Sequence, residues 1–534
     1  MKKILALATA LVLVLSLAGT AFAEIDPANY TYFEDPITLT ASKNDTFAFH
    51  GYDDEWVDST NNKWYDVIKE VLNVDFSYKW VTESDDESYH TKWNLALASG
   101  DIPNFGAVNR VTYEALVEAN LVADMTDYYE QYASETVKSL VEGSPEQAYM
   151  TRDGRLIGYP DVRPSMDSYD VIVVRKDWME KVGVTEIPTT IEGIIDLGKK
   201  FVDAKLGGEN TYALCVGEAR AASTWGGLQG FFQGHGIPYA NGYWMEDEET
   251  GELYYGPTDE RMKDALLTLQ DLYAQGLIKE DYLVTDAKES FVAGECGIIY
   301  SVCFGPVNAV DLYAVDEEVD LIAADVPTLT GNKPDYYVNA VPGRFFFVHK
   351  DAPDIEKQAF VETLNLMQDL FSDFDYDWGY HRGTNPFAPG DQMESAFQYA
   401  LYYAEIEHAY TTGDLDSFLT ANAKTYYTRL VDYENGDRSL GKYHGIYRVP
   451  EGTYNIIYDA MEDDRVHNSY YTAPPTENIQ EYQAMLDTVL MDAVNQVIMG
   501  ADISVWEKAV EEWHVTGGQD MLDDVNEWYA EHKD

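Results

Sequence analysis

The chain has 534 residues, and its 94 acidic side chains outnumber 36 basic ones, for a formal net charge of −58. Such a charge repels nucleic acid and anionic lipid, which excludes both as partners, and it disfavours a polyanionic ligand such as a uronate polymer. An apolar fraction of 46%, with 41 Tyr and 11 Trp, excludes a disordered chain and indicates a well-packed globular protein.

The first residues have the pattern of an export signal. Two lysines precede an apolar run over residues 4–17, and Ala21-Phe22-Ala23 then supplies the small residues that a signal peptidase recognises. We expect cleavage before Glu24, so that residues 1–23 are a signal peptide. No cysteine follows directly, so we expect a secreted or periplasmic protein without a lipid anchor.

Beyond the signal, strand-like and helix-like segments alternate. Apolar and polar residues alternate over 37–41 and 74–78, as in half-buried strands, and apolar residues from Trp64 to Leu72 recur on one helical face. Buried strands are also predicted by three continuous apolar runs, at 171–174, 297–300 and 345–348. This rhythm predicts a mainly parallel sheet covered by helices, repeated in two lobes.

The C-terminal part is predicted to be helical. After Pro474-Pro475, apolar residues keep an uninterrupted helical spacing from Ile479 to Ile498, and Gly500 ends that helix. Two shorter amphipathic helices are predicted over 506–528. The length of the chain requires more than one domain, because a single hydrophobic core does not organise so many residues.

Sequence patterns of catalytic and metal sites are missing. There is no Gly-x-Ser-x-Gly elbow, His-Glu-x-x-His motif, phosphate loop or dinucleotide fingerprint. The ten histidines are scattered, which argues against zinc. The glycine cluster over 226–236 has the wrong spacing for phosphate and predicts a turn or a close backbone approach. We therefore expect neither a cofactor nor a metal.

The cysteines are too few for a disulfide-stapled scaffold. Cys296 and Cys303 each lie in an apolar stretch, so we expect buried free thiols, while a bridge between these two stays open. The third cysteine is Cys215.

Several segments, in order, resemble those of the family 1 extracellular solute-binding proteins, the sugar-importer group. The matching segments are Leu97–Asn104 (a Gly-Asp-x-Pro turn), Asn120–Thr126, Asp153–Pro160 (an Asp-Gly-x-x-x-Gly-x-Pro strand), Arg175–Trp178 with Pro188–Thr190, Phe291–Ile298, and Gly500 to Tyr529. Each segment alone is a weak indication of the family. The resemblance depends on all of them occurring in the family's order behind an export signal. Larger relatives often hold a calcium loop, but 203–210 lacks its ligand spacing, and we expect no calcium there.

The resemblance implies an α/β fold of the periplasmic-binding-protein type (type II), with two lobes made from discontinuous stretches, hinge crossovers and a helical C-terminus. It places lobe 1 in 24–166 and 285–318, lobe 2 in 167–284 and 319–475, and C-terminal helices in 476–534. It implies a monomer that captures a small molecule, an oligosaccharide or sugar derivative, in the cleft and delivers it to an ABC permease, without catalysis.

A sugar site needs aromatic rings beside hydrogen-bonding groups, on loops at strand ends. The residues that combine this chemistry with such a position are Asp45, Arg163, Tyr169, Glu218, Trp225, Tyr300, Phe304, Arg344 and Trp378. The resemblance aligns Phe304 with a cleft aromatic. For Arg344, a structural ion pair is an equally good interpretation in so acidic a chain.

Three alternatives stay open. In the first, the solute is a peptide or a polyamine, and a polyamine would suit the acidic charge of the chain. In the second, the chain is a secreted glycan-degrading enzyme, which requires a fixed carboxylate pair with one raised pKa. In the third, it is a surface adhesin or sensor that uses the same fold without transport.

Overall fold

The computed structural model describes residues 27–44, 60–82, 86–217, 226–239, 242–305, 312–313, 316, 318–340, 342–372 and 392–533. The chain forms two compact units, which we describe separately. Unit 1 consists of Met1–Pro164, Val341–Ala396 and Asp416–Asn422. Unit 2 consists of Ser165–Ala340, Phe397–Leu415 and Ala423–Asp534.

Unit 1 contains a five-stranded sheet in the order β2-β1-β3-β13-β6. Its strands are β1 (Ile37–Asn44), β2 (Val74–Thr82), β3 (Phe105–Val108), β6 (Tyr159–Pro160) and β13 (Phe345–Val348). β1 pairs in parallel with β2 and β3, whereas β13 is antiparallel to both β3 and β6. The carboxyl ends of β1, β2, β3 and β6 therefore lie at one edge, together with the amino end of β13.

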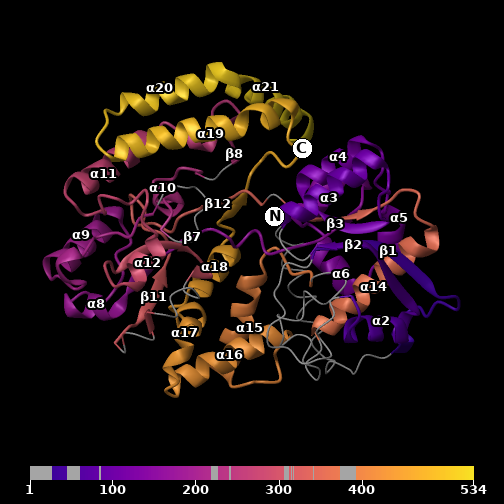
Figure 1. Ribbon diagram of the computed structural model, residues 1–534. Helices are drawn as coiled ribbons and strands as arrows, with labels where there is room; N and C mark the ends of the chain where they lie inside the picture. Colours follow the sequence, from indigo (N-terminus) through magenta and orange to yellow (C-terminus); the bar gives the residue numbers. More distant parts are fainter. Residues whose placement is uncertain are drawn as a thin grey trace. The chain divides into compact units, whose positions relative to one another are not determined.

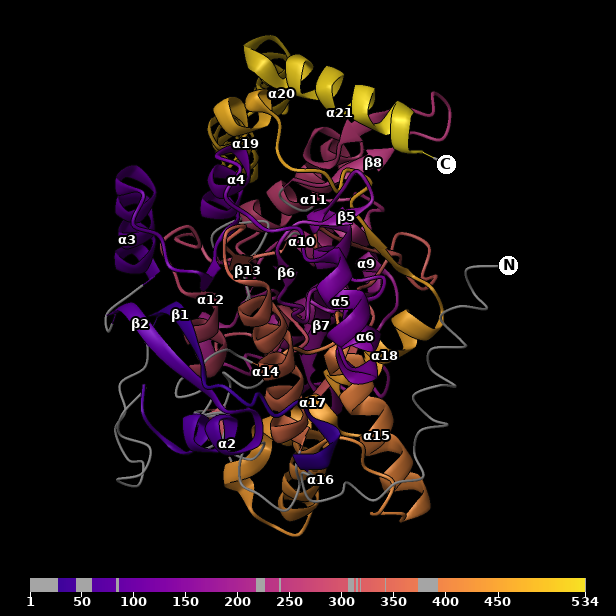
Figure 2. The same ribbon diagram turned by 90° about the vertical axis from the view of Figure 1, so that its right-hand side faces the viewer.

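Helices pack against this sheet around a core rich in aromatic residues. The helices are α2 (Lys63–Leu72), α3 (Asp86–Ser99), α4 (Arg110–Glu118), α5 (Thr126–Tyr132), α6 (Glu135–Val141), α7 (Pro145–Met150) and α14 (Asp354–Ser372), and a hairpin joins β4 (Thr151–Arg152) to β5 (Arg155–Leu156). α14 contacts β1, α2 and α5 (Figure 2). Phe345 of β13 stacks on Tyr113 of α4, with ring centroids 4.4 Å apart.

The central sheet of unit 2 has three strands, with β7 (Asp170–Arg175) between β10 (Ile298–Val302) and β11 (Leu321–Ala324). Every residue of β7 is buried, which confirms the buried strand predicted for 171–174 and adds Asp170 and Arg175 at its ends. Both neighbours run antiparallel to β7, so the carboxyl ends of β10 and β11 share an edge with the amino end of β7. The prediction of a mainly parallel sheet is wrong for this unit. The chain between β7 and β10 is long enough to connect them in either relative direction. The alternation of strands and helices along the sequence therefore does not determine whether the two strands are parallel or antiparallel.

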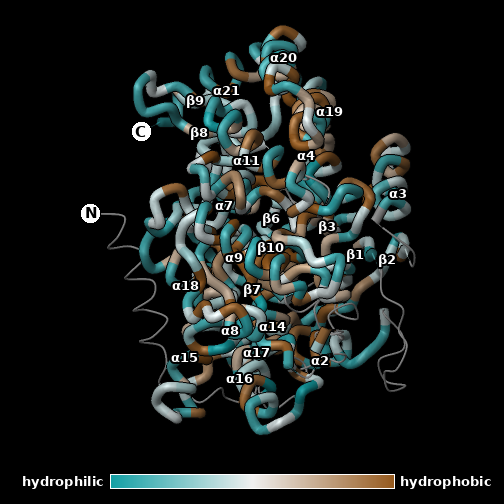
Figure 3. The backbone as a smooth tube through the Cα atoms, turned by 90° about the vertical axis from the view of Figure 1, so that its left-hand side faces the viewer, coloured by the Kyte–Doolittle hydropathy of each residue, from teal (hydrophilic) through white to brown (hydrophobic). Residues whose placement is uncertain are grey.

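The rest of unit 2 is mainly helical. Its helices are α8 (Lys176–Lys181), α9 (Ile191–Asp203), α10 (Gln229–Gly234), α11 (Met262–Ala274), α12 (Ala287–Val292), α15 (Gln398–Thr412), α16 (Ala421–Glu434, largely in this unit), α17 (Gly441–Tyr447), α18 (Thr453–Glu462), α19 (Glu477–Ile498), α20 (Ser504–Trp513) and α21 (Gln519–His532). Two further strand pairs are β8 (Trp244–Glu246) with β9 (Leu253–Tyr255), and β12 (Tyr336–Val338) with β14 (Val466–Asn468). Apolar residues concentrate at β7 and β10, and polar residues alternate along the helices (Figure 3).

The helical C-terminus is confirmed. α19 begins at the cap residue Thr476, whose hydroxyl accepts a hydrogen bond from the backbone N–H of Ile479. α20 and α21 pack against α19, which also contacts α11 (Figure 1). In the part of the chain that the structure describes, no helix is long and apolar enough to cross a membrane.

Segment 285–318 differs from its expected place. The resemblance assigns it to lobe 1, but β10 pairs with β7 along five residues, and the segment lies in unit 2. Continuous apolar runs such as 297–300 predict a buried strand without specifying its partner. Unit 1 instead takes up Val341–Ala396, through β13 and α14.

The cysteines also differ from expectation. Cys215 and Cys296 form a disulfide, while Cys303 is buried and free. Residues 212 and 215 bridge in parallel to Cys296 and Ile299, which brings the two sulfur atoms together. The expectation of a free thiol is therefore wrong for Cys296. Which cysteine it bonds to depends on segments that are neighbours in the fold but far apart in sequence, and the apolar stretch around Cys296 does not specify them.

The glycine cluster makes close backbone approaches, as predicted. A Cβ atom at Gly230 would lie 2.7 Å from Tyr300 Cδ1, and one at Gly234 would lie 2.2 Å from the carbonyl oxygen of Pro327. A side chain larger than hydrogen does not fit at either position.

Candidate functional site

Two predicted site residues meet at the edge of the unit 1 sheet. Arg344 directly precedes β13, and Arg163 follows β6 by three residues. Phe345 pairs with Pro160 in the sheet, so the chain leaving β6 lies beside the chain entering β13. This pairing places both arginines at the carboxyl ends of the parallel strands, where ligands commonly bind in open α/β sheets.

The two arginines converge on Asp161, which sequence reasoning did not single out. Arg163 Nε and Nη2 lie 3.1 and 3.0 Å from Asp161 Oδ1, and Arg344 Nε lies 3.1 Å from Asp161 Oδ2. The Asp161 side chain is fully buried, whereas those of Arg163 and Arg344 are 30% and 41% exposed. Arg344 therefore forms a structural ion pair with Asp161, which is one of its two interpretations from the sequence. Its side chain is also partly exposed, as the other interpretation, contact with a ligand, requires.

Glu146, in the first turn of α7, lies next to this ion pair. Its Oε1 accepts a long hydrogen bond of 3.4 Å from the backbone N–H of Arg163. Burial raises the pKa of Glu146 to about 7, and the negative charge of Asp161 also favours the protonated form. At neutral pH the group therefore carries only part of a negative charge.

In unit 2, aromatic residues lie where the strands end. Phe304 follows β10, is half-buried, and meets the ring of Tyr399 edge-on, with centroids 6.0 Å apart. The backbone N–H of Tyr399 donates to Asp167 Oδ2 at 2.8 Å, which anchors the start of α15 near the amino end of β7. Phe304 and Tyr399 together offer the partly exposed aromatic surface that a sugar face requires.

Tyr169 precedes β7 and is completely buried. Its ring stacks on Tyr336 with centroids 4.0 Å apart. Asp325, at the end of β11, accepts hydrogen bonds from the Tyr336 hydroxyl at 2.9 Å and from Arg465 Nη1 at 3.0 Å. Tyr169 thus packs behind this edge of the sheet.

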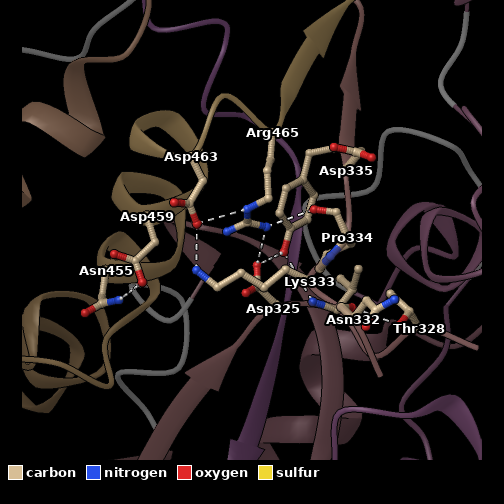
Figure 4. Close-up of polar contacts among 12 residues, drawn as sticks. Asp325, Thr328, Asn332, Lys333, Pro334, Asp335, Asn455, Asp459, Asp463 and Arg465 are labelled. Carbon is tan, nitrogen blue, oxygen red and sulfur yellow. Dashed lines mark hydrogen bonds and ion pairs between the residues drawn. The ribbon is translucent and has the colours of Figure 1, made fainter. Parts of the chain in front are cut away.

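A second ion-pair cluster surrounds Arg465. Its Nη1 also donates to the carbonyl oxygen of Pro334 at 2.8 Å, and Lys333 Nζ lies 2.6 Å from Asp463 Oδ2 (Figure 4). Arg465 is 8% exposed. The cluster joins the loop after β11 to the chain that follows α18.

Tyr300 lies inside unit 2, not at a strand end. It is in the middle of β10, is 1% exposed, and packs against Phe231 of α10 and the backbone of Gly230. The apolar run around Tyr300 predicts the strand but not the side of the sheet that the ring faces. Four other predicted site residues, Asp45, Glu218, Trp225 and Trp378, lie outside the described residues.

Among the described residues, no group of three or more His, Cys, Asp or Glu side chains could hold a metal ion. In the segment 203–210, Lys205 Nζ pairs with Glu209 at 2.7 Å.

Comparisons of the chain with known proteins identify a family and two relatives. A family model described as "Bacterial extracellular solute-binding protein" matches residues 51–366. Lipoprotein LipO of Bacillus subtilis (strain 168) is 24% identical over 492 residues, covering 88% of each chain. The polygalacturonan/rhamnogalacturonan-binding protein YtcQ of the same organism is 22% identical over 484 residues, covering 87% of this chain and 88% of that protein.

Solved structures with the same fold are also found. The S. pneumoniae ABC-transporter substrate-binding protein FusA, as an EF-hand mutant in complex with fructo-nystose, is 13% identical with a TM-score of 0.58. The match covers 93% of this chain and 99% of that one. The family resemblance and the α/β fold of the periplasmic-binding-protein type are confirmed.

Proposed function

The chain belongs to the bacterial extracellular solute-binding proteins, and we propose that it captures an oligosaccharide or sugar derivative and delivers it to the permease of an ABC importer. The match to the family model over 51–366 is the observation that carries this proposal. Support for a sugar comes from the relative that binds polygalacturonan or rhamnogalacturonan and from the neighbour that holds fructo-nystose.

The edge residues of each unit suit such a solute. Unit 1 presents the guanidinium groups of Arg163 and Arg344, and unit 2 presents the rings of Phe304 and Tyr399. Sugar hydroxyls pair with charged donors, and the apolar faces of sugar rings stack on aromatic rings. We propose Arg163, Phe304 and Arg344 as residues that contact the solute, with Tyr169 and Tyr300 in supporting positions. Asp45, Glu218, Trp225 and Trp378 remain proposed solute contacts from the sequence.

We propose that the protein performs no catalysis on its solute. In the described part of unit 1, Glu146 and Asp161 are two neighbouring carboxyl groups, and burial raises the pKa of Glu146 to about 7, as a general acid would require. However, two guanidinium groups neutralise Asp161, and both acids are almost completely buried. A glycosidase needs such a pair to face its substrate.

We propose export with cleavage before Glu24, and action as a monomer. Retention by the partner permease, or free secretion, fits this sequence.

Thermal unfolding of the mature protein against mono- and oligosaccharides, peptides and polyamines tests the proposal. A solute at a hundred times its Kd stabilises the fold by about 2.7 kcal/mol, which raises Tm by a few degrees. We expect a shift with one class of oligosaccharide and no product after long incubation. A shift with peptides or polyamines alone would refute the carbohydrate assignment, and turnover of the sugar would refute the binding role.

A further inference from the structure

A group of aromatic side chains lies on one side of the two-stranded β12-β14 sheet in unit 2. Tyr337 of β12 and His467 of β14 are register partners, and the centroids of their rings lie 5.9 Å apart. Successive side chains of a strand point to opposite sides. Tyr337 therefore points away from the side on which its neighbour Tyr336 stacks on Tyr169, at the edge of the central sheet.

Tyr243, directly before β8, is the buried centre of this group. Its ring meets that of Tyr337 edge-on, with centroids 5.6 Å apart, and its hydroxyl donates to the carbonyl oxygen of Asn468 at 3.3 Å. Burial raises the pKa of this tyrosine, and the nearby hydroxyls of Tyr337, Tyr470 and Tyr254 raise it further. The hydroxyls of four tyrosines therefore lie close together.

The rings around this centre reach the surface, and we call them the tyrosine face: Tyr254, Tyr337, His467 and Tyr470. Tyr470 is 41% exposed, the His467 side chain is 40% exposed, and the other two rings are half-buried. Backbone contacts hold the chain that carries Tyr470. Its N–H donates to the carbonyl oxygen of Trp244 at 2.9 Å, and the N–H of Trp244 donates to Ser469 Oγ at 3.0 Å. A surface held in this way loses little conformational entropy when a ligand binds.

Hydrogen-bonding groups border the rings. His467 Nε2 lies 3.1 Å from Asp335 Oδ1, and the Asp335 side chain is 55% exposed. Arg261, 52% exposed, donates from Nε and Nη2 to the carboxylate of Asp259 at 2.9 and 2.6 Å. Its Nη2 also lies 3.4 Å from the hydroxyl oxygen of Tyr254. The tyrosine face therefore combines apolar ring surfaces with oriented donors and acceptors.

This combination suits a sugar ring. The apolar C–H faces of a pyranose stack on aromatic rings, and its hydroxyl groups both donate and accept hydrogen bonds. The exposed charged groups beside the rings, Arg261 and Asp335, are opposite in sign. A neutral ligand with many hydroxyl groups therefore suits this face better than a polyamine or a polyanion.

We propose that the tyrosine face is a further carbohydrate-binding site of unit 2, separate from the rings at the end of β10. A pyranose residue stacks on Tyr337 and Tyr470, and its hydroxyl groups form hydrogen bonds with the polar groups that border them. This inference rests on the proposed binding of an oligosaccharide.

Calorimetric titration of the mature protein with neutral gluco-, xylo-, manno- and galacto-oligosaccharides tests the proposal. Tyr470→Ala is expected to weaken one sugar-binding event about 10-fold, because a stacked ring is lost. Tyr410→Ala is the matched control, because Tyr410 of α15 is 40% exposed in the same unit and its hydroxyl donates to Glu434 at 3.1 Å. This control should leave the affinity for every sugar unchanged.

Variants at Tyr337 separate stacking from hydrogen bonding. Tyr337→Ala is expected to weaken the same binding event as Tyr470→Ala, whereas Tyr337→Phe keeps the ring and should retain most of the affinity. Melting curves of all variants establish that they fold.

The outcomes distinguish this inference from the proposed function. Wild-type affinity of folded Tyr470→Ala and Tyr337→Ala proteins for every sugar that the wild type binds would overturn the inference and leave the proposed function intact. So would an equal loss in Tyr410→Ala and Tyr470→Ala, or a loss in Tyr470→Ala confined to spermidine. Failure of the wild-type protein to bind any of the sugars would overturn both.

Discussion

Asp170 Oδ2 accepts a hydrogen bond of 2.9 Å from the backbone N–H of Gly230, in the buried centre of unit 2. The carboxyl group lies at the amino end of β7 and is 1% exposed. Burial raises its pKa to about 7, and the hydrogen bond from Gly230 opposes this shift only in part.

The stability of unit 2 is therefore expected to depend on the protonation of Asp170. The pKa is near 3.9 in the unfolded chain and about 7 in the fold, so the folded state holds one more proton between these values. The contribution of Asp170 is complete below about pH 4 and is lost as the pH rises through 7, at up to about 1.4 kcal/mol per pH unit.

Asp170→Asn removes this titration and keeps an oxygen for the Gly230 N–H. Urea unfolding between pH 4.5 and 8 is expected to show a stability advantage of the variant that grows with pH, up to about pH 7. Asp203→Asn is the control, because Asp203 is exposed at the end of α9. Identical pH profiles of wild type and Asp170→Asn would refute this role.

Gly230→Ala is expected to lower the free energy of unfolding by about 1–3 kcal/mol, because overpacking forces neighbouring atoms to move. Its Cβ atom would lie 2.7 Å from Tyr300 Cδ1 and 2.8 Å from Asp170 Cβ. At Gly343 no atom lies within 4 Å of an added Cβ, so Gly343→Ala is the matched control and should change stability little. Denaturation midpoints of the two variants check this, and a neutral Gly230→Ala would contradict the close packing.

The bridge between Cys215 and Cys296 spans 81 residues. In the chain-entropy model, closing a loop of that length stabilises the fold by roughly 4–5 kcal/mol. Double replacement by Ser is expected to lower the denaturation midpoint strongly, whereas Cys303→Ala, which keeps the bridge, should have a smaller effect. Thiol titration of the denatured, non-reduced protein should find one thiol, and three would show that the bridge does not form.

Arg175 is expected to be required for the fold of unit 2. The side chain is 2% exposed, and its Nε and Nη2 donate to Asp177 at 2.7 and 2.6 Å, while Nη2 also reaches Asp316 at 2.8 Å. Arg175→Met leaves the buried Asp177 without its main partner, at an expected cost of about 3–5 kcal/mol.

Lys205→Met provides the comparison for an exposed pair. Lys205 and Glu209 are 59% and 83% exposed, so the variant should change stability by less than about 1 kcal/mol. Equilibrium unfolding of both proteins measures the difference. Equal stabilities of the two variants would mean that burial of the Arg175 pair has no energetic consequence.

Phe304→Ala is expected to weaken binding of the solute identified by thermal shift about 10-fold or more, because the ring offers an apolar surface at the end of β10. Calorimetric titration measures the loss. Tyr32→Ala removes a ring that is 59% exposed in unit 1 and should leave affinity unchanged. Unaltered affinity of a folded Phe304→Ala protein would remove this residue from the proposed site.

The sequence by itself determined the elements that depend on local pattern. Alternating and continuous apolar runs located β1, β2, β7, β10 and β13, and helical spacing located α2 and α19, since burial of one face requires these periods. The order of short motifs identified the family. The sequence also placed Arg163 and Arg344 among the candidate site residues, because both combine hydrogen-bonding groups with a position next to a strand.

Contacts between distant residues were decided only by the tertiary structure. Pairing of β13 with β6 brought Arg344 onto Asp161, and pairing of β10 with β7 moved segment 285–318 into unit 2. The same neighbours joined Cys215 to Cys296 and turned Tyr300 toward Gly230. A local pattern specifies that a residue is buried, but its partner depends on strand order and direction, which no short stretch of sequence contains. For the same reason the total charge of −58 did not reveal the exposed guanidinium groups above a buried carboxylate.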